Sequence, residues 1–306
     1  MPDRDWPTQI EYQDTVARPA SAFSDRTLQA GTPADLLPFG LPRPITGQFA
    51  NVYALNCPGP LTLAVRLFLS PSPDRAARYA VLRAHITSLP PERRQALVRF
   101  AYQAAGISVR GAAHPLVLMD WAAGVPLHEF VERHLYDSAR LSRLADQWRA
   151  VVEALRMARI AHGDLQHGNI LVESGTDGAP DTIRLIDYDG MWVPALHGWV
   201  GQENGHVAFQ HRERATHDFG PRMDRFSALV IHASLRVVAV APELWFRLHD
   251  GDNLLFRRED FQDPETGRAF STLKDSLRAH RETAALVRQL KAAASGPLTG
   301  VPELER

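Results

Sequence analysis

One loop of the chain carries an aspartate and an asparagine at a spacing that suits catalysis. Residues 162–172 read HGDLQHGNILV, so that Asn169 follows Asp164 after a short interval. A positioned carboxylate can orient a hydroxyl group and accept its proton, and an amide oxygen can ligate a divalent cation. A second carboxylate must reach that cation from another segment, and LIDYDG supplies Asp187, with Asp189 shortly after it. Such a set suits phosphoryl transfer, in which catalysis is mostly positioning and charge neutralisation.

The elements around this loop must hold it in place. Apolar residues at helical spacing between positions 141 and 155 predict a long amphipathic helix that ends just before His162. After the loop, NILVE and TIRLID predict a short strand pair around a turn at 174–181. Further helices are predicted at about 223–240 and 273–294, so this part of the chain is mostly helical.

The first 121 residues have a different pattern. ITGQFANVYAL and LTLAVRLFL are rich in β-forming residues and flank the turn signal NCPGP, which predicts a hairpin. A helix is expected at about 72–89, ended by Pro90 and Pro91, and two more β-rich runs follow it, RFAYQAAGISV and HPLVLMDW. We therefore expect an α+β fold with two lobes: a small antiparallel β-rich lobe with one helix, then a larger α-helical lobe, with a cleft between them.

The domain organisation follows from these patterns. We expect an N-terminal arm at 1–43, a small lobe at 44–121 and a large lobe at 122–306. The arm is rich in proline and polar residues, which predicts an extended segment with one short helix near 8–16, packed on or near the small lobe.

Composition narrows the class of protein. The chain has 306 residues, a formal net charge of −1 and a single cysteine, Cys57. The charge gives no global attraction to nucleic acid or anionic membranes, and one cysteine excludes a disulfide framework and a cysteine-rich zinc site. The N-terminus is polar and acidic, unlike a signal peptide, and His232 and Arg236 interrupt the longest apolar stretch. We expect a cytoplasmic protein that binds neither nucleic acid nor membrane.

The motifs, taken in order over about residues 40–236, resemble those of the protein kinase superfamily. HGDLQHGN resembles the catalytic loop, which implies Asp164 as the catalytic base and Asn169 as a metal ligand. DYD resembles the metal-binding triplet led by Asp187. GHVAFQHRE resembles the end of an activation segment closing on Glu213, and DRFSALV resembles the central helix, where Asp224 would brace the catalytic loop.

The resemblance also implies a nucleotide site, with ATP and Mg²⁺ (or Mn²⁺) as cofactors. ITGQFANVY resembles the glycine-rich loop, LAVR stands where the strand with the phosphate-binding lysine belongs, and VLMDW resembles the last strand and the hinge. Arg66 would contact the α/β-phosphates as a catalytic residue, and Met119 would be the gatekeeper beside adenine. The residues expected at the nucleotide are Gly47, Phe49, Val52, Ala64, Arg66, Met119, Asp120, Trp121, Ala122 and Leu171.

The form of the motifs is similar to that of a bacterial kinase-like group. Its members are often encoded beside a metal-dependent Ser/Thr phosphatase and a von Willebrand A-type protein, which makes these two proteins candidate partners besides a protein substrate. The favoured function is phosphorylation of Ser or Thr hydroxyls on proteins.

Several departures from the kinase pattern predict a slow or atypical enzyme. Arg66 replaces the strand lysine, and the helix after it offers only Asp74 as an acidic partner. Gln166 replaces the catalytic-loop lysine, and His167 could supply the missing charge only if it is protonated. Gly163 replaces the arginine before the catalytic aspartate, so switching by a phosphorylated activation loop is not expected.

Two other functions stay open. Weak catalytic residues would suit a nucleotide-binding pseudokinase that acts as a regulatory scaffold. The HGD…GN form also resembles small-molecule kinases of the aminoglycoside and choline type.

Other polar residues are expected to be structural. His162 is expected to be buried and to hydrogen-bond the backbone, and Glu213 to form a buried ion pair in the large lobe. His206 and His211 are not expected to bind metal, because no cysteine or acidic set stands at ligand spacing.

Overall fold

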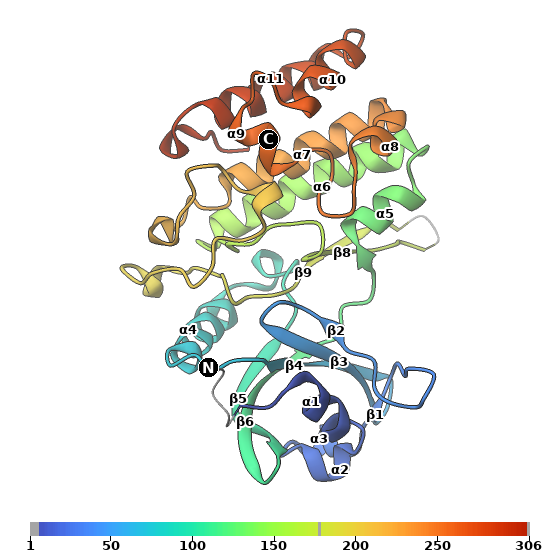
Figure 1. Cartoon of the computed structure of the whole chain (residues 1–306), viewed down its shortest axis with the longest axis vertical. Coiled ribbons are helices and arrows are strands. Elements are labelled where there is room, and N and C mark those ends of the chain that lie inside the picture. The colour runs from blue at the N-terminus through green and yellow to red at the C-terminus, as the bar shows by residue number, and fades with distance from the viewer. Residues whose placement is uncertain (1–5, 177–178, 305–306) are drawn as a thin grey trace. The chain divides into compact units, whose positions relative to one another are not determined.

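The computed structural model describes residues 6–176 and 179–304. Contacts divide the chain into two compact units (Figure 1). Unit 1 comprises Met1–Thr87 and Val98–Ala122, and unit 2 comprises Ser88–Leu97 and Ala123–Arg306. The segment Ser88–Leu97 is tied to unit 2 by hydrogen bonds, one of them from the Leu185 N–H to the Ala96 carbonyl at 2.7 Å.

Unit 1 is built on a six-stranded antiparallel sheet in which the order is β1-β3-β4-β6-β5 and β2 pairs with β3. The predicted hairpin around NCPGP is β3–β4, with Val52 opposite Arg66. The strands are β1 Thr32–Pro33, β2 Ile45–Thr46, β3 Ala50–Cys57, β4 Leu61–Phe68, β5 Phe100–Val109 and β6 Ala112–Asp120.

The N-terminal segment forms three short helices, α1 Gln9–Val16, α2 Pro19–Ala22 and α3 Arg26–Gln29, rather than an extended arm with one helix. A capping box between Thr8 and Glu11 starts α1. These helices lie over one face of the sheet (Figure 1). Their apolar side chains are buried in one core with those of β3 and β4. Short-range composition suggested an extended arm, but burial of this apolar surface decided the conformation. The expected helix after β4 is α4, Arg75–Ser88.

Unit 2 is mostly helical and carries one small sheet of order β7-β8-β9. Residues 177 and 178 of the predicted turn at 174–181 lie outside the described residues. The helices are α5 Leu127–Arg133, α6 Ser138–Met157, α7 Arg225–Val240, α8 Trp245–Leu248, α9 Arg258–Gln262, α10 Arg268–Ser276 and α11 Arg281–Ser295. The strands are β7 Val125–Pro126, β8 Ile170–Glu173 and β9 Thr182–Leu185. Short 3-10 helices are η1 Pro91–Arg93, η2 Pro194–Leu196, η3 Val207–Phe209, η4 Thr216–Asp218, η5 Pro242–Leu244 and η6 Leu298–Gly300.

The core of unit 2 lies between α6 and α7. Nearly every residue of α7 is buried, as expected for a helix that is apolar on all sides. Trp148 of α6 is also buried, and its indole N–H donates to the Ala228 carbonyl of α7 at 3.0 Å. The packed pair of helices α6 and α7 therefore holds the chain segments next to it, on which the candidate site lies.

The single helix predicted at about 273–294 is wrong. The chain forms α10 and α11 instead, and the His280 N–H closes a turn on the Leu277 carbonyl between them. Leu273 and Leu277 are buried, and α11 packs on α7 (Figure 1). Across the described residues, no helix has both the length and the apolar character needed to cross a membrane.

Candidate functional site

The loop that carries Asp164 follows α6. Asp224, at the start of α7, hydrogen-bonds to the backbone of this loop. The Asp224 carboxylate accepts the backbone N–H groups of His162 and Gly163. Burial raises the pKa of Asp224, while these two N–H donors act in the opposite direction. His162 is fully buried, and its Nε2 lies 2.9 Å from the Ile186 carbonyl oxygen, which fits the expected structural role.

The backbone at position 163 accepts only glycine, which is why no arginine stands directly before Asp164. Its φ is +86°, in the left-handed region, and a Cβ added to it would lie 2.2 Å from the Gly190 carbonyl oxygen. Only glycine fits this close approach of two backbone segments.

Asp164 and Asn169 are in direct contact. The Asn169 Nδ2 donates to the Asp164 Oδ2 at 2.8 Å and to the Asp164 carbonyl at 3.0 Å. The backbone N–H of His206 donates to the other carboxylate oxygen, Oδ1, at 2.7 Å. The carboxylate is therefore oriented by one donor on each oxygen.

Asp187 lies at the same end of the β8–β9 pair. Ile170 at the start of β8 is opposite Leu185 at the end of β9, and the Ile186 N–H donates to the Asn169 carbonyl at 3.0 Å. Asp187 is the next residue, and its φ of +65° is uncommon for a residue other than glycine. Backbone conformations of this kind are concentrated at functional sites. The structure thus brings Asp164, Asn169 and Asp187 to one end of a two-stranded pair.

The donor set fits Mg²⁺ better than a transition metal. The Asn169 Nδ2 is committed to Asp164, so the amide oxygen is the atom that could ligate a cation, beside the Asp187 carboxylate. Within residues 6–176 and 179–304, no group of three or more His, Cys, Asp or Glu side chains is arranged to hold a metal ion. Mg²⁺ commonly takes only one or two protein oxygens and completes its shell with phosphate and water.

The sequence-predicted nucleotide residues of unit 1 share one face of its sheet. Val52 pairs with Arg66 and Ala64 pairs with Met119, so these four side chains point to the same side. This face is opposite the one covered by α1–α3, whose core contains Tyr53, Val65 and Leu67 from the alternate positions of β3 and β4. Arg66 is 9% exposed.

The glycine-rich turn and the strand end of unit 1 supply the other predicted nucleotide residues. The Gly47 N–H donates to the Ala50 carbonyl at 2.9 Å and closes a turn that leaves Phe49 exposed. At the end of β6, the N–H of Asp120 bonds the Arg99 carbonyl and that of Trp121 bonds the Thr62 carbonyl. The Asp120 backbone could therefore meet adenine only through its carbonyl.

Ala122 and Leu171 complete the predicted set. Ala122 is the last residue of unit 1, next to Trp121. Leu171 lies on β8 in unit 2, opposite Pro126 of β7 and Arg184 of β9.

The structure shows the local surroundings of the residues that depart from the kinase pattern. Gln166 does not extend outward as a long cation would, because its Oε1 accepts the Gly168 N–H at 2.7 Å within the same loop. Burial lowers the pKa of His167 to about 3, so this imidazole is neutral at physiological pH and cannot replace the missing lysine charge. Asp74 is engaged by the Arg78 side chain at 2.6 Å.

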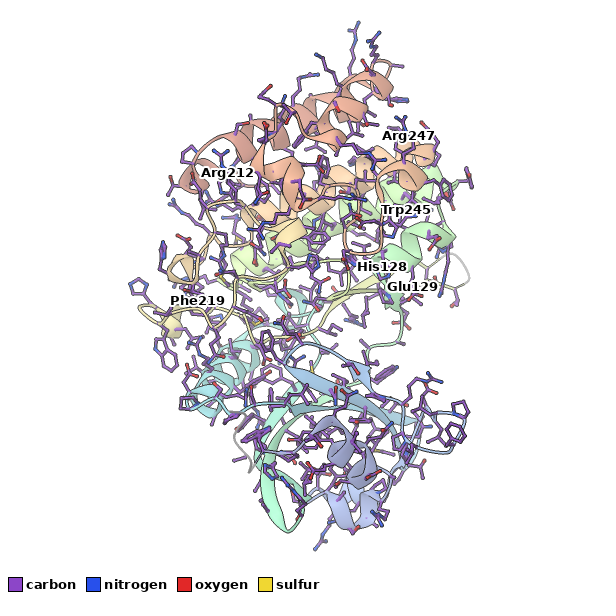
Figure 2. The ribbon with its side chains drawn as sticks, in the orientation of Figure 1. His128, Glu129, Arg212, Phe219, Trp245 and Arg247 are labelled. Carbon is purple, nitrogen blue, oxygen red and sulfur yellow. The ribbon has the colours of Figure 1, made fainter. Side chains whose placement is uncertain are left out.

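Three other histidines surround His167. His128 of α5 meets it edge to face at 4.6 Å between ring centroids, and His206 lies 6.1 Å away. His128 also lies 6.2 Å from His249 between ring centroids, and His249 is stacked on Trp245. Figure 2 labels His128 and Trp245. The Nδ1 atoms of His206 and His211 accept backbone N–H groups, which assigns both rings a local structural role.

The expectation of a buried ion pair at Glu213 is wrong. Glu213 is exposed, and its carboxylate accepts the Leu298 N–H at 2.9 Å. The arginine buried nearby is Arg214, whose side chain lies against Asp218 and Met223.

Gly205 and Gln210 are the residues near Asp164 that sequence reasoning missed. A Cβ at Gly205 would lie 2.9 Å from the Asp164 Oδ1 and 2.6 Å from the Gln210 Nε2. The sequence gives only a weak signal for these two residues, because a single glycine before a histidine forms no motif with a characteristic spacing.

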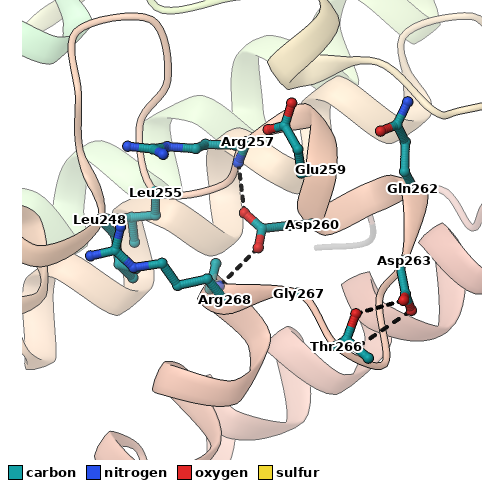
Figure 3. A pocket seen from close by; sticks show the side chains of 11 residues that line it. Leu248, Leu255, Arg257, Glu259, Asp260, Gln262, Asp263, Thr266, Gly267 and Arg268 are labelled. Carbon is teal, nitrogen blue, oxygen red and sulfur yellow. Dashed lines mark hydrogen bonds between the residues drawn. The ribbon is translucent and has the colours of Figure 1, made fainter.

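A separate pocket of about 460 Å³ lies around α9 and the start of α10, and it contains none of the predicted site residues. Its buried Asp260 accepts the N–H groups of Arg257 and Ala269, so this carboxylate is used to join two segments (Figure 3). Asp263 is likewise bonded to Thr266. The pocket is thus lined by polar groups that stabilise the local backbone.

Comparison with known proteins gives the fold. No protein-family model matches the sequence, and no curated protein matches it. Among solved structures, the chain is similar to the kinase PK-1 of Cydia pomonella granulovirus, with 13% sequence identity and a TM-score of 0.54. The match covers 87% of this chain and 89% of that chain. The chain therefore has an α+β protein-kinase-like fold, with a small antiparallel β-rich lobe and a larger α-helical lobe.

Proposed function

We propose that this chain is an ATP-dependent phosphotransferase that phosphorylates Ser or Thr hydroxyls of proteins in the cytoplasm. The observation that carries the proposal is the grouping of Asp164, Asn169 and Asp187 at one end of β8–β9 in a protein-kinase-like fold.

Each residue has a role set by its position. The Asp164 carboxylate, oriented by Asn169 and the His206 N–H, accepts the proton of the acceptor hydroxyl. The Asn169 amide oxygen and the Asp187 carboxylate would hold Mg²⁺. When bound, this ion neutralises charge on the triphosphate. Arg66 contacts the phosphates from the sheet face that it shares with Val52.

The rate is expected to be low. A positioned base is worth about 10²–10⁴-fold, and the remaining reduction of the barrier has to come from cations near the transferred phosphoryl group. Gln166 is neutral and bonded within its own loop, and His167 is neutral because it is buried.

Transfer of labelled γ-phosphate to itself and to a generic protein substrate tests the proposal. Asp164→Ala and Asp187→Asn should each lower transfer by about 10²–10⁴-fold. Asp252→Asn, at an exposed carboxylate, is the matched control and should leave transfer unchanged. Equal transfer by wild type and Asp164→Ala would exclude the proposed chemistry.

The uncharged surroundings of the predicted base favour one second candidate, a nucleotide-binding pseudokinase. Gln166 and His167 leave this loop without the cation that speeds transfer. A thermal shift with ATP, together with no transfer in wild type or in Asp164→Ala, would support the scaffold function instead.

A further inference from the structure

We propose that residues 296–304, which follow α11, form a clamp that positions Asp164 as the base. This inference rests on the proposed function and assigns roles to Glu303 and Glu213, which are positioning residues because neither contacts the substrate. The clamp contacts two elements of unit 2, and each of these elements holds Asp164 or its loop by hydrogen bonds.

The first contact of the clamp lies at the start of α7. The Arg225 side chain donates to the Glu303 carboxylate and to the Val301 carbonyl, the latter at 3.3 Å. Val301 is buried, and the Arg225 side chain is 24% exposed. The contact is therefore partly shielded from water, which makes it stronger than an ion pair on the open surface.

This first contact is one residue away from the support of the catalytic loop. Arg225 directly follows Asp224, whose carboxylate accepts the backbone N–H groups of His162 and Gly163. These are the two residues before Asp164. Fixing Arg225 therefore fixes the carboxylate on which the backbone of the loop is hydrogen-bonded.

A small cavity of about 60 Å³ shows that the clamp also lies beside the loop itself. It is lined in common by residues of the clamp, the loop, the end of α6 and the start of α7, among them Glu303, Leu304, Leu165, Arg156 and Asp224. The clamp therefore lies where α6 ends and α7 begins.

The second contact of the clamp reaches the segment that supplies a donor to Asp164. The Leu298 N–H donates to the Glu213 carboxylate at 2.9 Å. Farther back in the same segment, the His206 N–H donates to the Asp164 Oδ1 at 2.7 Å. Residues 208–211 between these positions are buried. Because a packed segment does not deform continuously, a shift at Glu213 is passed on toward His206.

The clamp has a fixed shape of its own. The Gly300 N–H closes a turn on the Pro297 carbonyl at 2.9 Å, and the Val301 N–H bonds the next carbonyl along the chain. Where the clamp leaves α11, the Arg212 side chain donates to the Ser295 carbonyl at 3.0 Å. The two contacts are thus joined through a short folded segment.

The chemistry of a general base makes such positioning matter. Asp164 can accept a proton only if its carboxylate lies within hydrogen-bond reach of the acceptor hydroxyl, and a misplacement of about 1 Å can cost about 10²-fold in rate. The clamp contains none of the residues proposed for the nucleotide or the metal. Its loss should therefore lower kcat and leave the KM for ATP unchanged.

Amide hydrogen exchange on the full chain tests the clamp without any enzymatic activity. Glu303→Ala should speed exchange of the His162 and Gly163 N–H groups by about 10-fold. Glu213→Ala should speed exchange of the His206 N–H by a similar factor. Glu213 and Glu303 are both exposed, so neither substitution opens the core and both variants are expected to fold.

Three comparisons separate positioning from a general loss of stability. Lys291→Met removes an ion pair between α11 and Glu265 and should leave the three reporter amides unchanged. Glu213→Gln keeps an oxygen acceptor for the clamp and should also match the wild type. Amides in the middle of α7, such as that of Val230, report global unfolding and should change by less than about twofold in every variant. Unchanged reporter amides, or an equal acceleration in α7, would overturn the inference.

Kinetics give a second readout. Glu303→Ala and Glu213→Ala should each lower kcat by about 3- to 30-fold with the KM for ATP unchanged, whereas Glu213→Gln and Lys291→Met should keep wild-type kcat. Wild-type kcat in both alanine variants would overturn the inference. A wild-type chain without transfer would contradict the proposed function, whereas hydrogen exchange would still decide whether the clamp holds the loop.

Discussion

At the scale of single residues, the site depends on backbone approach as much as on charge. Gly163 and Gly190 bring two backbone segments together next to Asp164, and a Cβ at Gly205 would lie 2.9 Å from the Asp164 Oδ1. The departures from the kinase pattern at 163 and 166 are thus part of a consistent local packing, in which Gly163 has no room for a side chain and Gln166 closes its own loop.

Gly163→Ala is expected to be strongly destabilising. The substitution adds the strain of a left-handed φ, about 1–2 kcal/mol, and a contact of 2.2 Å with the Gly190 carbonyl oxygen. Gly198→Ala is the matched control, because Gly198 has a φ of +84° and nothing within 4 Å of its Cβ position. Urea unfolding should give about 1–2 kcal/mol for Gly198→Ala and more than about 3 kcal/mol for Gly163→Ala. Similar losses for the two variants would mean that the clash is relieved by backbone movement.

At the scale of elements, packing decides both conformation and charge. The three N-terminal helices are too short to be stable alone and exist because they cover a sheet face. In the same way, α6 and α7 bury a histidine, His232, at their contact.

Tyr12 tests whether the α1–α3 cover contributes to stability. It is fully buried, and its hydroxyl donates to the Phe68 carbonyl at 3.0 Å. Tyr12→Ala should cost about 3–5 kcal/mol and Tyr12→Phe about 1 kcal/mol in denaturant unfolding. Ile10→Ala, at a neighbouring side chain that is 69% exposed, should change stability by less than about 0.5 kcal/mol. A loss below about 1 kcal/mol for Tyr12→Ala would argue that the segment is a detachable arm.

His232 predicts how acid affects stability. Burial lowers its pKa to about 4, helped by the charges of Arg236 and Arg149, whereas the Ala145 backbone and Asp146 act in the opposite direction. The unfolded chain, with a histidine pKa of about 6.5, binds more protons between these values, so this stability is complete above about pH 6.5 and declines as the pH falls toward 4. Between pH 7 and pH 5 the loss from this group is about 1–2 kcal/mol. His232→Gln should remove that part of the pH dependence in urea titrations; an identical slope in both proteins would refute the assignment.

At the scale of the whole molecule, each unit carries its own group of proposed ligand-binding residues. Unit 1 carries the sheet face with Val52, Ala64, Arg66 and Met119, and unit 2 carries Asn169, Leu171 and Asp187. Binding of nucleotide or metal would stabilise the folded chain against unfolding.

The thermal shift caused by ATP, measured with and without Mg²⁺, separates the contribution of the nucleotide residues from that of the metal ligands. Mg²⁺ and ATP at 100 times Kd should stabilise the wild type by about 2.7 kcal/mol, and chelation by EDTA should remove most of the effect. Arg66→Met should weaken the shift with or without metal, whereas Asp187→Asn should remove only its metal-dependent part. Arg278→Met, at an arginine whose side chain is 80% exposed and pairs with Asp275, is the control and should behave as wild type. A shift that persists in full in Asp187→Asn with Mg²⁺ would exclude this residue as a ligand.

The sequence by itself determined the α+β class, the order of the motifs, the hairpin β3–β4 and the positions of α6 and α7. These follow from period-2 and period-3.6 patterns and from turn residues, which are properties of neighbouring residues. The grouping of Asp164, Asn169 and Asp187 was expected from spacing and resemblance, and the register of β8 with β9 brings them to one end.

Tertiary structure alone decided the rest. The helical cover of the sheet, the break between α10 and α11 and the exposure of Glu213 depend on surfaces that meet only after folding. The neutral state of His167 depends on burial, and one of the donors to the Asp164 carboxylate, the His206 N–H, comes from far along the chain. Desolvation and long-range hydrogen bonds have no sequence period, because they are set by which residues come together in space.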